Sequence, residues 1–401
     1  MSFARRSLPL STLPLAVALL LAGCVTAPPA PSPQPAPQPI PQPIPQPAPQ
    51  PPVAPAPTGF VPATFAELPG WARDDLRAAW PAFLSSCSVL GKRADWKESC
   101  TVARTVDKGS EAAIRLFFET FLQPQRVVAP DGSDTGLVTG YYEPLLRGAR
   151  RQGGPYQTPL YKVPDDLLTV ELAGLYPELK GKRLRGRLQG RKVVPYSSRA
   201  EIAQANFSGK ELLWVEDSVE AFFLEVQGSG RVQLDSGETV RVAYADQNGH
   251  PYKSIGKWLI EQGELTPEQA SAQGIKAWIA GHPTRKQELF NANPSYVFFR
   301  EEKLPDPSIG PKGSLGVPLT PQRSVAVDAS QVPLGVPLFL STTQAASDIP
   351  MQRLVMAQDT GGAIKGAIRV DFFFGFGTEA AENAGRMKQR GQVWVLLPKP
   401  Q

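Results

Sequence analysis

Histidine and cysteine are scarce in this 401-residue sequence, which has two histidines, His250 and His282, and three cysteines. Because neither histidine has a cysteine or an acid at ligand spacing, the sequence predicts no metal centre, and we expect no cofactor. A pair of Ser229 with His250 lacks the G-x-S-x-G turn that exposes a nucleophilic serine, which argues against a serine hydrolase. The chemistry must therefore come from other side chains.

Excess charge is also small. The 42 lysines and arginines face 37 acids, and the formal net charge of +5 is too weak and too scattered for a dedicated nucleic-acid binder. A composition of 42% hydrophobic and 20% charged residues excludes a wholly disordered chain and a simple coiled coil. At this length, two domains are the default expectation.

The N-terminal apolar run is too short for a membrane span. Residues 13–21 fall below the roughly 20 residues that a spanning helix needs, and Pro14 interrupts them. A short basic start precedes the run, so residues 1–23 predict a signal peptide. The sequence Leu-Ala-Gly before Cys24 resembles a bacterial lipobox, which implies that Cys24 is lipidated and anchors the protein at a membrane. Val25, in place of aspartate, favours the outer membrane.

Proline is abundant in one segment only. Residues 28–57 contain 16 prolines, mostly in Pro-Gln-Pro repeats. This segment therefore predicts an extended polyproline II spacer with a reach on the order of 90 Å, so that residues 24–58 comprise the lipidated Cys24 and the proline-rich spacer. The same repeats also fit a docking ligand for a proline-reading module, and this alternative stays open.

Two apolar stripes at helical spacing begin the globular part near residue 59. They cover residues 71–84 and 114–121, and Cys87 and Cys100 lie between them. Because the export signal places the chain in an oxidising compartment, a disulfide is favoured over two free thiols. Closing so short a loop would stabilise the fold by about 3 kcal/mol, so we expect the bridge to be structural.

Beyond residue 130 the pattern changes to short β-rich runs separated by glycine and proline. Such spacing is typical of a barrel or a sandwich. Before residue 301 the predicted strands are residues 137–142, 221–227, 231–234, 239–243 and 297–300. A helical stretch is predicted over residues 255–288, with a break at residues 282–283.

After residue 318, three apolar runs each end in an aspartate. These acids are Asp328, Asp359 and Asp371. Carboxylates at strand ends can converge on one rim of a small barrel and raise one another's pKa. One of them could then stay protonated near neutral pH and serve as the general acid that glycosidic cleavage requires. Strand-end aspartates are also common as turn formers and caps, so the pattern alone leaves that alternative open.

Longer phrases resemble a known family. They are Thr139–Pro144, Val226–Gly230, Gln247–Tyr252, Asn293–Phe299 and Gln358–Gly366. Together, in this order, they resemble the membrane-bound lytic murein transglycosylase A family. The last phrase, with Asp328 and Asp371, resembles that family's C-terminal three-aspartate domain, at about residues 320–398. The ordered matches run from about residue 60 to about residue 398.

The resemblance implies a mainly β fold with some helices, in which a double-psi β-barrel is interrupted by a second β-rich domain. Residues 59–144 and 295–401 would form the barrel domain. Residues 145–294 would form the inserted domain, and a groove between the two would hold a glycan strand.

The implied activity is that of a peptidoglycan lytic exotransglycosylase, although the sequence leaves exo and endo cutting open. The family cleaves the β-1,4 bond between N-acetylmuramic acid and N-acetylglucosamine and leaves a 1,6-anhydromuramic end. The family's acid falls on Asp359, which would act first as general acid and then as base. Asp328 and Asp371 would tune its pKa, position the C6 hydroxyl or stabilise the cationic transition state.

Three other functions remain open on the sequence. A peptidoglycan hydrolase would use two of the carboxylates and add water. A wall-binding lipoprotein would hold glycan without cutting it. A scaffold would recruit other proteins through the proline-rich arm.

Several side chains could contact the glycan. Those predicted for substrate binding are Tyr141, Tyr142, Gln227, Ser229, Asn248 and Tyr252. Aromatic rings stack on sugar faces, and amides and hydroxyls bond N-acetyl or lactyl groups. The implied partners are peptidoglycan strands, the outer membrane through Cys24, and cell-wall synthesis or hydrolysis proteins, and we expect no nucleic acid. The implied location is the periplasmic face of the outer membrane.

Overall fold

A computed structural model describes residues 59–179, 182, 184–205, 207–304 and 306–399. The predicted signal peptide, the lipidated Cys24 and the proline-rich spacer lie outside these residues. Among the helices of the described part, none has both the length and the apolar character to cross a bilayer.

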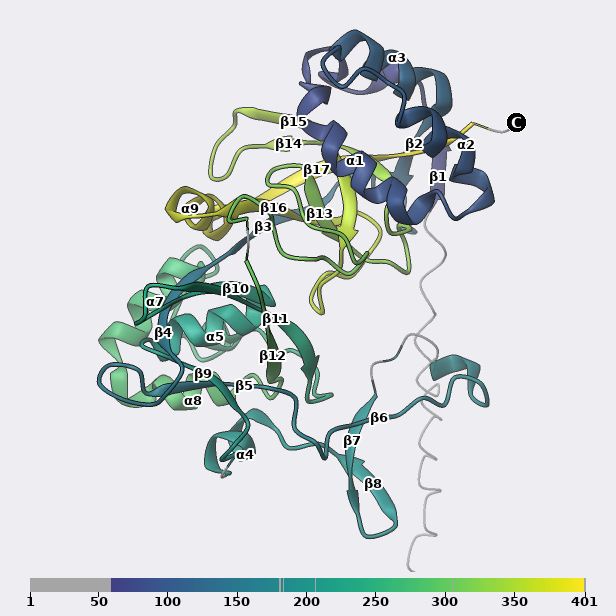
Figure 1. Ribbon diagram of the computed structural model, residues 1–401. Helices are drawn as coiled ribbons and strands as arrows, with labels where there is room; N and C mark the ends of the chain where they lie inside the picture. The colour runs from purple at the N-terminus through teal and green to yellow at the C-terminus, as the bar shows by residue number, and fades with distance from the viewer. Residues whose placement is uncertain (1–58, 180–181, 183, 206, 305, 400–401) are drawn as a thin grey trace, which may run out of the picture. The chain divides into compact units, whose positions relative to one another are not determined.

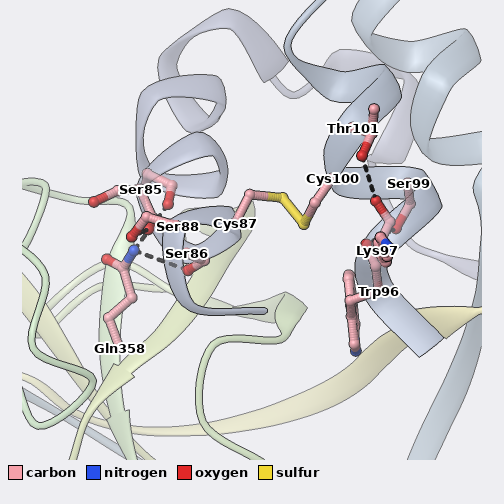
Figure 2. Close-up of a disulfide and its surroundings, with 11 residues drawn as sticks. Ser85, Ser86, Cys87, Ser88, Trp96, Lys97, Ser99, Cys100, Thr101 and Gln358 are labelled. Carbon is pink, nitrogen blue, oxygen red and sulfur yellow. Dashed lines mark hydrogen bonds between the residues drawn. A yellow bond between two sulfur atoms is a disulfide. The ribbon is translucent and has the colours of Figure 1, made fainter. Parts of the chain in front are cut away.

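Three helices form a layer, and the two apolar stripes of the sequence fall within this part of the chain (Figure 1). They are α1 (Leu76–Leu90), α2 (Ala94–Ala103) and α3 (Glu111–Phe121), after the short 3-10 helices η1 (Phe65–Glu67) and η2 (Trp71–Arg73). Asp75 and Ser110 cap α1 and α3, because each side chain accepts a hydrogen bond from a backbone N–H of the first turn. A disulfide between Cys87 and Cys100 ties α1 to α2 (Figure 2).

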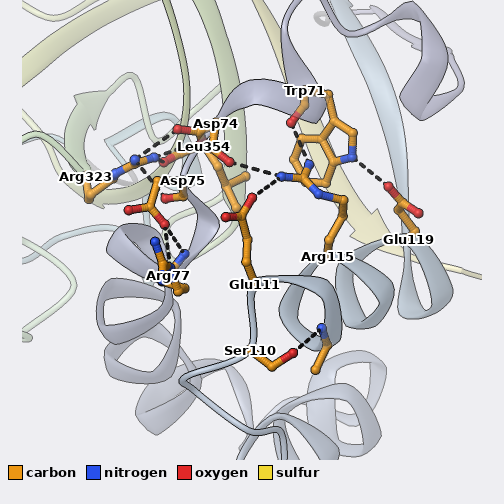
Figure 3. A network of polar contacts seen from close by, with 11 residues as sticks. Trp71, Asp74, Asp75, Arg77, Ser110, Glu111, Arg115, Glu119, Arg323 and Leu354 are labelled. Atoms are coloured by element: carbon orange, nitrogen blue, oxygen red, sulfur yellow. Dashed lines mark hydrogen bonds and ion pairs between the residues drawn. The ribbon is translucent and has the colours of Figure 1, made fainter.

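A buried ion pair attaches the segment before α1 to the strands (Figure 3). The two carboxylate oxygens of Asp74 accept hydrogen bonds from the Arg323 guanidinium at 2.9 Å each, and one also accepts from the Leu354 N–H at 2.7 Å. Nearby, Arg115 donates to the carbonyls of Trp71 and Asp74. Because these charge-assisted bonds satisfy both buried charges, the pair can be kept away from water.

Six strands close into a barrel. They are β3 (Gly136–Glu143), β13 (Ser324–Val327), β14 (Pro337–Thr343), β15 (Pro350–Asp359), β16 (Arg369–Phe376) and β17 (Lys388–Pro398). The long β17 pairs with β3 through its first half and with β14 through its second, so the sheet closes on itself. β13 is parallel to β15, and β16 is parallel to β3. Two further strands, β1 (Gly59–Pro62) and β2 (Leu122–Val128), extend the sheet from β17.

Side-chain alternation separates two faces of the barrel wall. Val325 and Val327 of β13 belong to the main apolar core. Ala326, between them, belongs to a small separate cluster with Tyr141 and Phe373 on the outer face. The main core also receives α1, which packs against β15. The helix α9 (Thr378–Arg386) packs against β3 and β16.

A second sheet of six strands is built from the middle of the chain. Its order is β12 (Val297–Glu302), β11 (Thr239–Gln247), β10 (Ser229–Leu234), β4 (Leu145–Ala149), β9 (Glu211–Val215) and β5 (Thr158–Tyr161). The helices of this part are α4 (Arg199–Gln204), α5 (Ser218–Gln227), α6 (Ile255–Glu261), α7 (Ala272–Gly281), η4 (Pro283–Arg285) and α8 (Lys286–Asn291). A small third sheet contains β6 (Leu168–Thr169), β7 (Arg185–Gln189) and β8 (Lys192–Pro195), and η3 (Pro177–Leu179) lies between β6 and β7 in the chain.

The mainly β fold with some helices is confirmed, but two local predictions are wrong. Residues 221–227 form the end of α5 instead of a strand. Asp217 caps this helix by accepting from two backbone N–H groups, and Gly228 ends it with φ 81°. The capping residues lie outside the apolar run, so the run by itself looked like a strand. The predicted helix over residues 255–288 has a second break, because residues 262–271 separate α6 from α7.

Candidate active site

A bulge in β15 decides which way Asp359 points. Val325 of β13 pairs with Ala357, but the next residue, Ala326, pairs with Asp359, so Gln358 is an extra residue. In a regular strand without the bulge, Ala357 and Asp359 would share a face, and Asp359 would point to the side of Val325, into the apolar interior of the barrel. The bulge instead aligns Asp359 with Ala326 on the outer face.

The extra residue is held by the helical layer. The Gln358 amide nitrogen donates to the Ala82 carbonyl at 2.8 Å and to Ser86 Oγ at 3.0 Å, and its oxygen accepts from Ser324 Oγ at 2.6 Å. Figure 2 shows this contact one residue away from Cys87, on the helix that the disulfide fixes. Because Gln358 is fully buried, these hydrogen bonds stabilise the bulge where no water can replace them.

The Asp359 carboxylate is held by four donors. Its Oδ1 accepts from the N–H and the hydroxyl of Ser314, at 2.9 and 3.0 Å, and from the Thr360 N–H at 2.9 Å. Its Oδ2 accepts from the Tyr141 hydroxyl at 3.1 Å. Burial raises the pKa of Asp359, and the four hydrogen bonds oppose that shift without cancelling it. The side chain is therefore fixed in place and holds its proton to higher pH than an ordinary aspartate.

Asp371 lies at the same level of the barrel wall. Ala326 pairs with Asp359 on one side and with Asp371 on the other, so about 10 Å separates the two backbones at the usual strand spacing. The Thr139 hydroxyl donates to Asp371 Oδ1 at 2.5 Å. Burial raises the pKa of Asp371, the negative charge of Asp359 adds to the shift, and Thr139 and Arg369 oppose it. The site thus contains two carboxyl groups that are both reluctant to ionise.

The position of Asp371 within its strand differs from the prediction. The sequence predicts a strand that ends in Asp371, whereas Asp371 is the third residue of β16. Because β16 is antiparallel to β13, its beginning lies at the end of the barrel where β13 and β15 finish. Asp371 therefore still reaches the rim that carries Asp359.

Asp328 has a different environment. Its carboxylate accepts from the Ser330 hydroxyl at 2.7 Å, the Ser330 N–H at 3.1 Å and the Gly366 N–H at 2.9 Å. Burial raises its pKa, but these hydrogen bonds and the charge of Lys365 together hold the pKa below its usual range. Within the described part of the chain, its hydrogen bonds tie the turn after β13 to the loop after β15. Asp328 is thus an ionised anchor for that loop.

Two partners of Asp359 were not predicted in this role. The sequence places Tyr141 among rings that stack on sugars, but Tyr141 is only 8% exposed and its ring packs 5.1 Å from Phe373. Burial and the nearby carboxylates raise its pKa well above the usual value, so its hydroxyl stays a neutral donor. Ser314 lies in a segment without regular structure, and no pattern in the sequence points to it. Only the tertiary fold brings it to Asp359.

The other predicted contacts fall into two groups. Gln227 ends α5 and Ser229 begins β10, and Gln227 Oε1 accepts from the Tyr142 N–H at 3.0 Å. These three residues therefore lie close together next to β3. Tyr252 is 37% exposed and precedes α6, so its ring is accessible to a ligand.

Asn248 is fully buried, and the protein itself uses its amide. The nitrogen donates to the Ser197 and Pro294 carbonyls at 2.9 Å each, and the oxygen accepts from the backbone N–H groups of His250 and Tyr296. An amide with two donors and two acceptor positions filled has no group left for a sugar. The predicted substrate contact of Asn248 therefore conflicts with this structure.

A buried charge cluster joins the end of β3 to the second sheet. Glu143 has a fully buried side chain, which accepts from Arg231 at 2.8 Å and from Arg241 at 2.6 Å. Arg241 also donates to the Ile309 carbonyl in the segment that leads to Ser314. Glu143 lies in one of the phrases of the sequence, yet nothing there indicates its arginine partners.

In the described residues, no group of three or more His, Cys, Asp or Glu side chains could hold a metal ion.

Comparisons with known proteins match this architecture. Residues 137–300 match the family model "MltA specific insert domain", and residues 323–397 match the "3D domain". The chain is 36% identical over 272 residues to the membrane-bound lytic murein transglycosylase A of Escherichia coli K12, covering 65% of this chain and 66% of that protein. It is 33% identical over 336 residues to the Vibrio cholerae protein of the same name, covering 79% of this chain and 86% of that protein.

Solved structures agree. MltA from Neisseria gonorrhoeae superposes with a TM-score of 0.74 at 37% identity, covering 88% of this chain and 97% of that chain. The membrane-bound lytic murein transglycosylase of Agrobacterium tumefaciens gives 0.76 at 31% identity, covering 84% and 97%. Escherichia coli MltA with bound chitohexaose gives 0.64 at 27% identity, covering 86% and 95%. The chain therefore belongs to the membrane-bound lytic murein transglycosylase A family.

Proposed function

We propose that this protein is a lytic transglycosylase that cleaves the β-1,4 bond between N-acetylmuramic acid and N-acetylglucosamine in peptidoglycan, with Asp359 as its single general acid and base. The observation that carries the proposal is the Asp359 carboxyl group, which burial keeps reluctant to ionise while four donors fix its orientation. Family membership and the chitohexaose bound by the Escherichia coli relative support a glycan as substrate.

The reaction balances without water. Protonated Asp359 gives its proton to the glycosidic oxygen, the bond to the anomeric carbon breaks, and N-acetylglucosamine leaves. The Asp359 carboxylate then takes the proton of the muramic C6 hydroxyl, whose oxygen attacks the anomeric carbon and closes the 1,6-anhydro ring. Because the substrate supplies its own nucleophile, no second catalytic carboxylate is required.

The remaining acids have separate parts in this proposal. Asp371 faces the same rim with a raised pKa, where its carboxyl group can bond the C6 hydroxyl or stabilise developing positive charge. Asp328 positions the loop after Asp359 without touching the sugar. Gln227, Ser229 and Tyr252 would contact the glycan.

The domain boundaries are also a proposal. Residues 59–144 and 295–401 would form the barrel domain, and residues 145–294 the insert. The second sheet begins at Leu145, which supports the first boundary, but it also contains β12 (Val297–Glu302), so the insert would extend to about residue 302 instead of residue 294. The glycan would bind between the two domains.

The test is digestion of purified peptidoglycan, with the products weighed by mass spectrometry. The wild-type protein should release muropeptides lighter by one water than the products of hydrolysis, and Asp359→Asn should release about a thousandfold less of them. Asp348→Asn, at an exposed aspartate between β14 and β15, is the matched control and should act like wild type. Products of full hydrolysed mass would contradict the proposal and favour a two-carboxylate hydrolase with Asp371, while binding without products would favour a wall-binding protein.

We also propose that acyl chains on Cys24 anchor the protein to the periplasmic face of the outer membrane. The Leu-Ala-Gly-Cys sequence and the membrane-bound names of the relatives support this location. Membrane fractionation tests it: in high salt, which weakens contacts between cations and lipid headgroups, Cys24→Ser should move the protein from the membrane fraction to the soluble fraction. A Cys24→Ser protein that stays in the outer-membrane fraction despite high salt would contradict the lipid anchor.

A further inference from the structure

The strongest concentration of charge in the molecule lies outside the candidate active site. Residues 179–200 contain eight lysines and arginines and no aspartate or glutamate. This excess is larger than the net charge of +5 of the whole chain, so the rest of the protein is close to neutral or slightly negative. A fold without a use for such charge would disperse it, because like charges repel.

Four of these eight cations lie on a projecting hairpin, and one of the four, Arg185, forms an ion pair with Asp246. β7 and β8 pair with Gln189 opposite Lys192, and Gly190 and Arg191 make the turn. The hairpin extends away from the six-stranded second sheet (Figure 1). The side chains of Arg187, Arg191 and Lys192 are exposed. In the described part of the chain none of the three makes an ion pair, so their charges are available to a ligand.

The two faces of the hairpin differ. Leu188 pairs with Val193, and because directly opposed residues point to the same face, the two side chains form an apolar pair. They are 64% and 53% exposed. Arg187 and Lys192 occupy positions of opposite parity and lie on the other face. The tip therefore carries an uncovered aliphatic pair on one face and cations on the other face and in the turn.

This chemistry separates the candidate ligands. A glycan is uncharged along its backbone and is usually bound by aromatic rings, so the aliphatic pair would gain little from it. Carboxylates on peptide stems would satisfy the cations but leave Leu188 and Val193 in water. A bilayer with anionic headgroups meets both requirements, since headgroups attract each cation and the acyl region accepts the aliphatic side chains.

The proposed lipid anchor keeps such a surface within reach. The 34 residues between Cys24 and the start of β1 could span about 100 Å as an extended polyproline II chain. Such a tether lets the domain either stand away from the membrane or return to it. A weak second contact then becomes effectively intramolecular.

We propose that the β7–β8 hairpin is a membrane-docking element that inserts Leu188 and Val193 into an anionic lipid surface while Arg187, Arg191 and Lys192 bind the headgroups. Docking would hold the second sheet against the membrane that carries the anchor, and release would let the catalytic domain reach glycan farther away. The location of the anchor rests on the proposed function, but binding of lipid by the hairpin does not.

The test uses the processed chain from residue 24 with Cys24→Ser, which carries no acyl group. We expect it to sediment with vesicles in which about a third of the lipid is phosphatidylglycerol, and to stay in solution with pure phosphatidylcholine. Replacing Arg187, Arg191 and Lys192 by alanine should weaken the partition about fivefold for each cation, or about a hundredfold in all. The matched control, Lys92→Ala with Lys97→Ala and Arg104→Ala, removes three exposed cations beside α2 and should change the partition little.

A second variant tests insertion directly. The emission of Leu188→Trp should shift to shorter wavelength when the anionic vesicles are added. The proposal is wrong if the hairpin triple variant binds these vesicles as well as wild type, or no worse than the control triple variant. It is equally wrong if the Leu188→Trp protein binds vesicles without a shift, or if the hairpin variants lose binding only to purified peptidoglycan. Release of anhydro products from soluble glycan strands should be unchanged in the hairpin variants, so a failed docking test and a failed catalytic proposal are distinguishable.

Discussion

Asp328 and Asp359 follow apolar runs in two parallel neighbouring strands, β13 and β15, yet the structure treats their carboxyl groups in opposite ways. Donors from Ser330 and Gly366 outweigh burial at Asp328 and lower its pKa. Burial outweighs four donors at Asp359 and raises its pKa. The number of hydrogen bonds alone therefore does not decide whether an aspartate is a structural anchor or an acid. The balance between burial and donors decides it.

Among the substitutions that distinguish Asp359 from Asp328, Asp359→Asn should have the largest effect on cleavage. The amide keeps the shape of the side chain but carries no proton that it can give and take back, so cleavage should fall about a thousandfold. The free energy of unfolding at neutral pH should rise in this variant, because the buried Asp359 carboxylate of the wild type disfavours folding and the amide carries no charge. Product release from peptidoglycan and urea unfolding measure the two effects. An active Asp359→Asn protein would assign the acid to another residue.

Gln358→Leu should remove the support of Asp359 and leave that of Asp328 intact. Leucine cannot bond Ala82, Ser86 and Ser324, so the bulge that turns Asp359 to the outer face loses its anchor. We expect the rate of cleavage to fall by a factor of about ten to a hundred and the free energy of unfolding to fall by about 1–3 kcal/mol. Gln352→Leu, on the same strand near its start, is a control that should retain activity. Unchanged cleavage in Gln358→Leu would show that the bulge holds without these bonds.

Asp328→Asn should affect stability more than chemistry. A neutral amide accepts the bonds from Ser330 and Gly366 less strongly, so the free energy of unfolding at neutral pH should fall by about 2 kcal/mol, with less than a tenfold change in cleavage. Because the pKa of Asp328 is lower in the folded state, its contribution is present above the unfolded pKa of about 3.9 and is lost as pH falls through the folded value.

Asp359 has the opposite sign of pH dependence. Its pKa is higher in the folded state, so its effect on stability becomes less favourable as pH rises from the unfolded pKa through the folded one. Urea unfolding of the wild type, Asp328→Asn and Asp359→Asn across this acid pH range measures the pH dependence that each aspartate contributes. If both variants changed the pH dependence in the same direction, the contrast between the two aspartates would be wrong.

Tyr141→Phe should give the smallest change, a shift in pH dependence. The Tyr141 hydroxyl lowers the pKa of Asp359 by donating to its carboxylate. Its removal should raise that pKa, and the alkaline limb of the pH profile of cleavage should move to higher pH. Tyr156→Phe, at a tyrosine outside the site, should leave the limb in place. A limb that moved to lower pH would contradict the hydrogen bond as the cause.

The sequence predicts much of this site for physical reasons. Apolar strands that end in acids are visible without a fold, because side-chain period and turn residues are local properties. The phrases around Tyr141 and Asp359 also lie in continuous sequence. Ser314 and the arginine partners of Glu143 could not be predicted, because they meet their partners from distant parts of the chain.

By itself, the sequence determined the family, the mainly β class and Asp359 as the candidate acid, since each depends on residues close together in the chain. Only the tertiary structure decided which aspartates share a rim and which one anchors a loop. The bulge at Gln358 reverses the facing of Asp359, and the antiparallel direction of β16 brings Asp371 beside it. Both depend on strand pairing, and pairing is set by long-range contacts that local patterns do not contain.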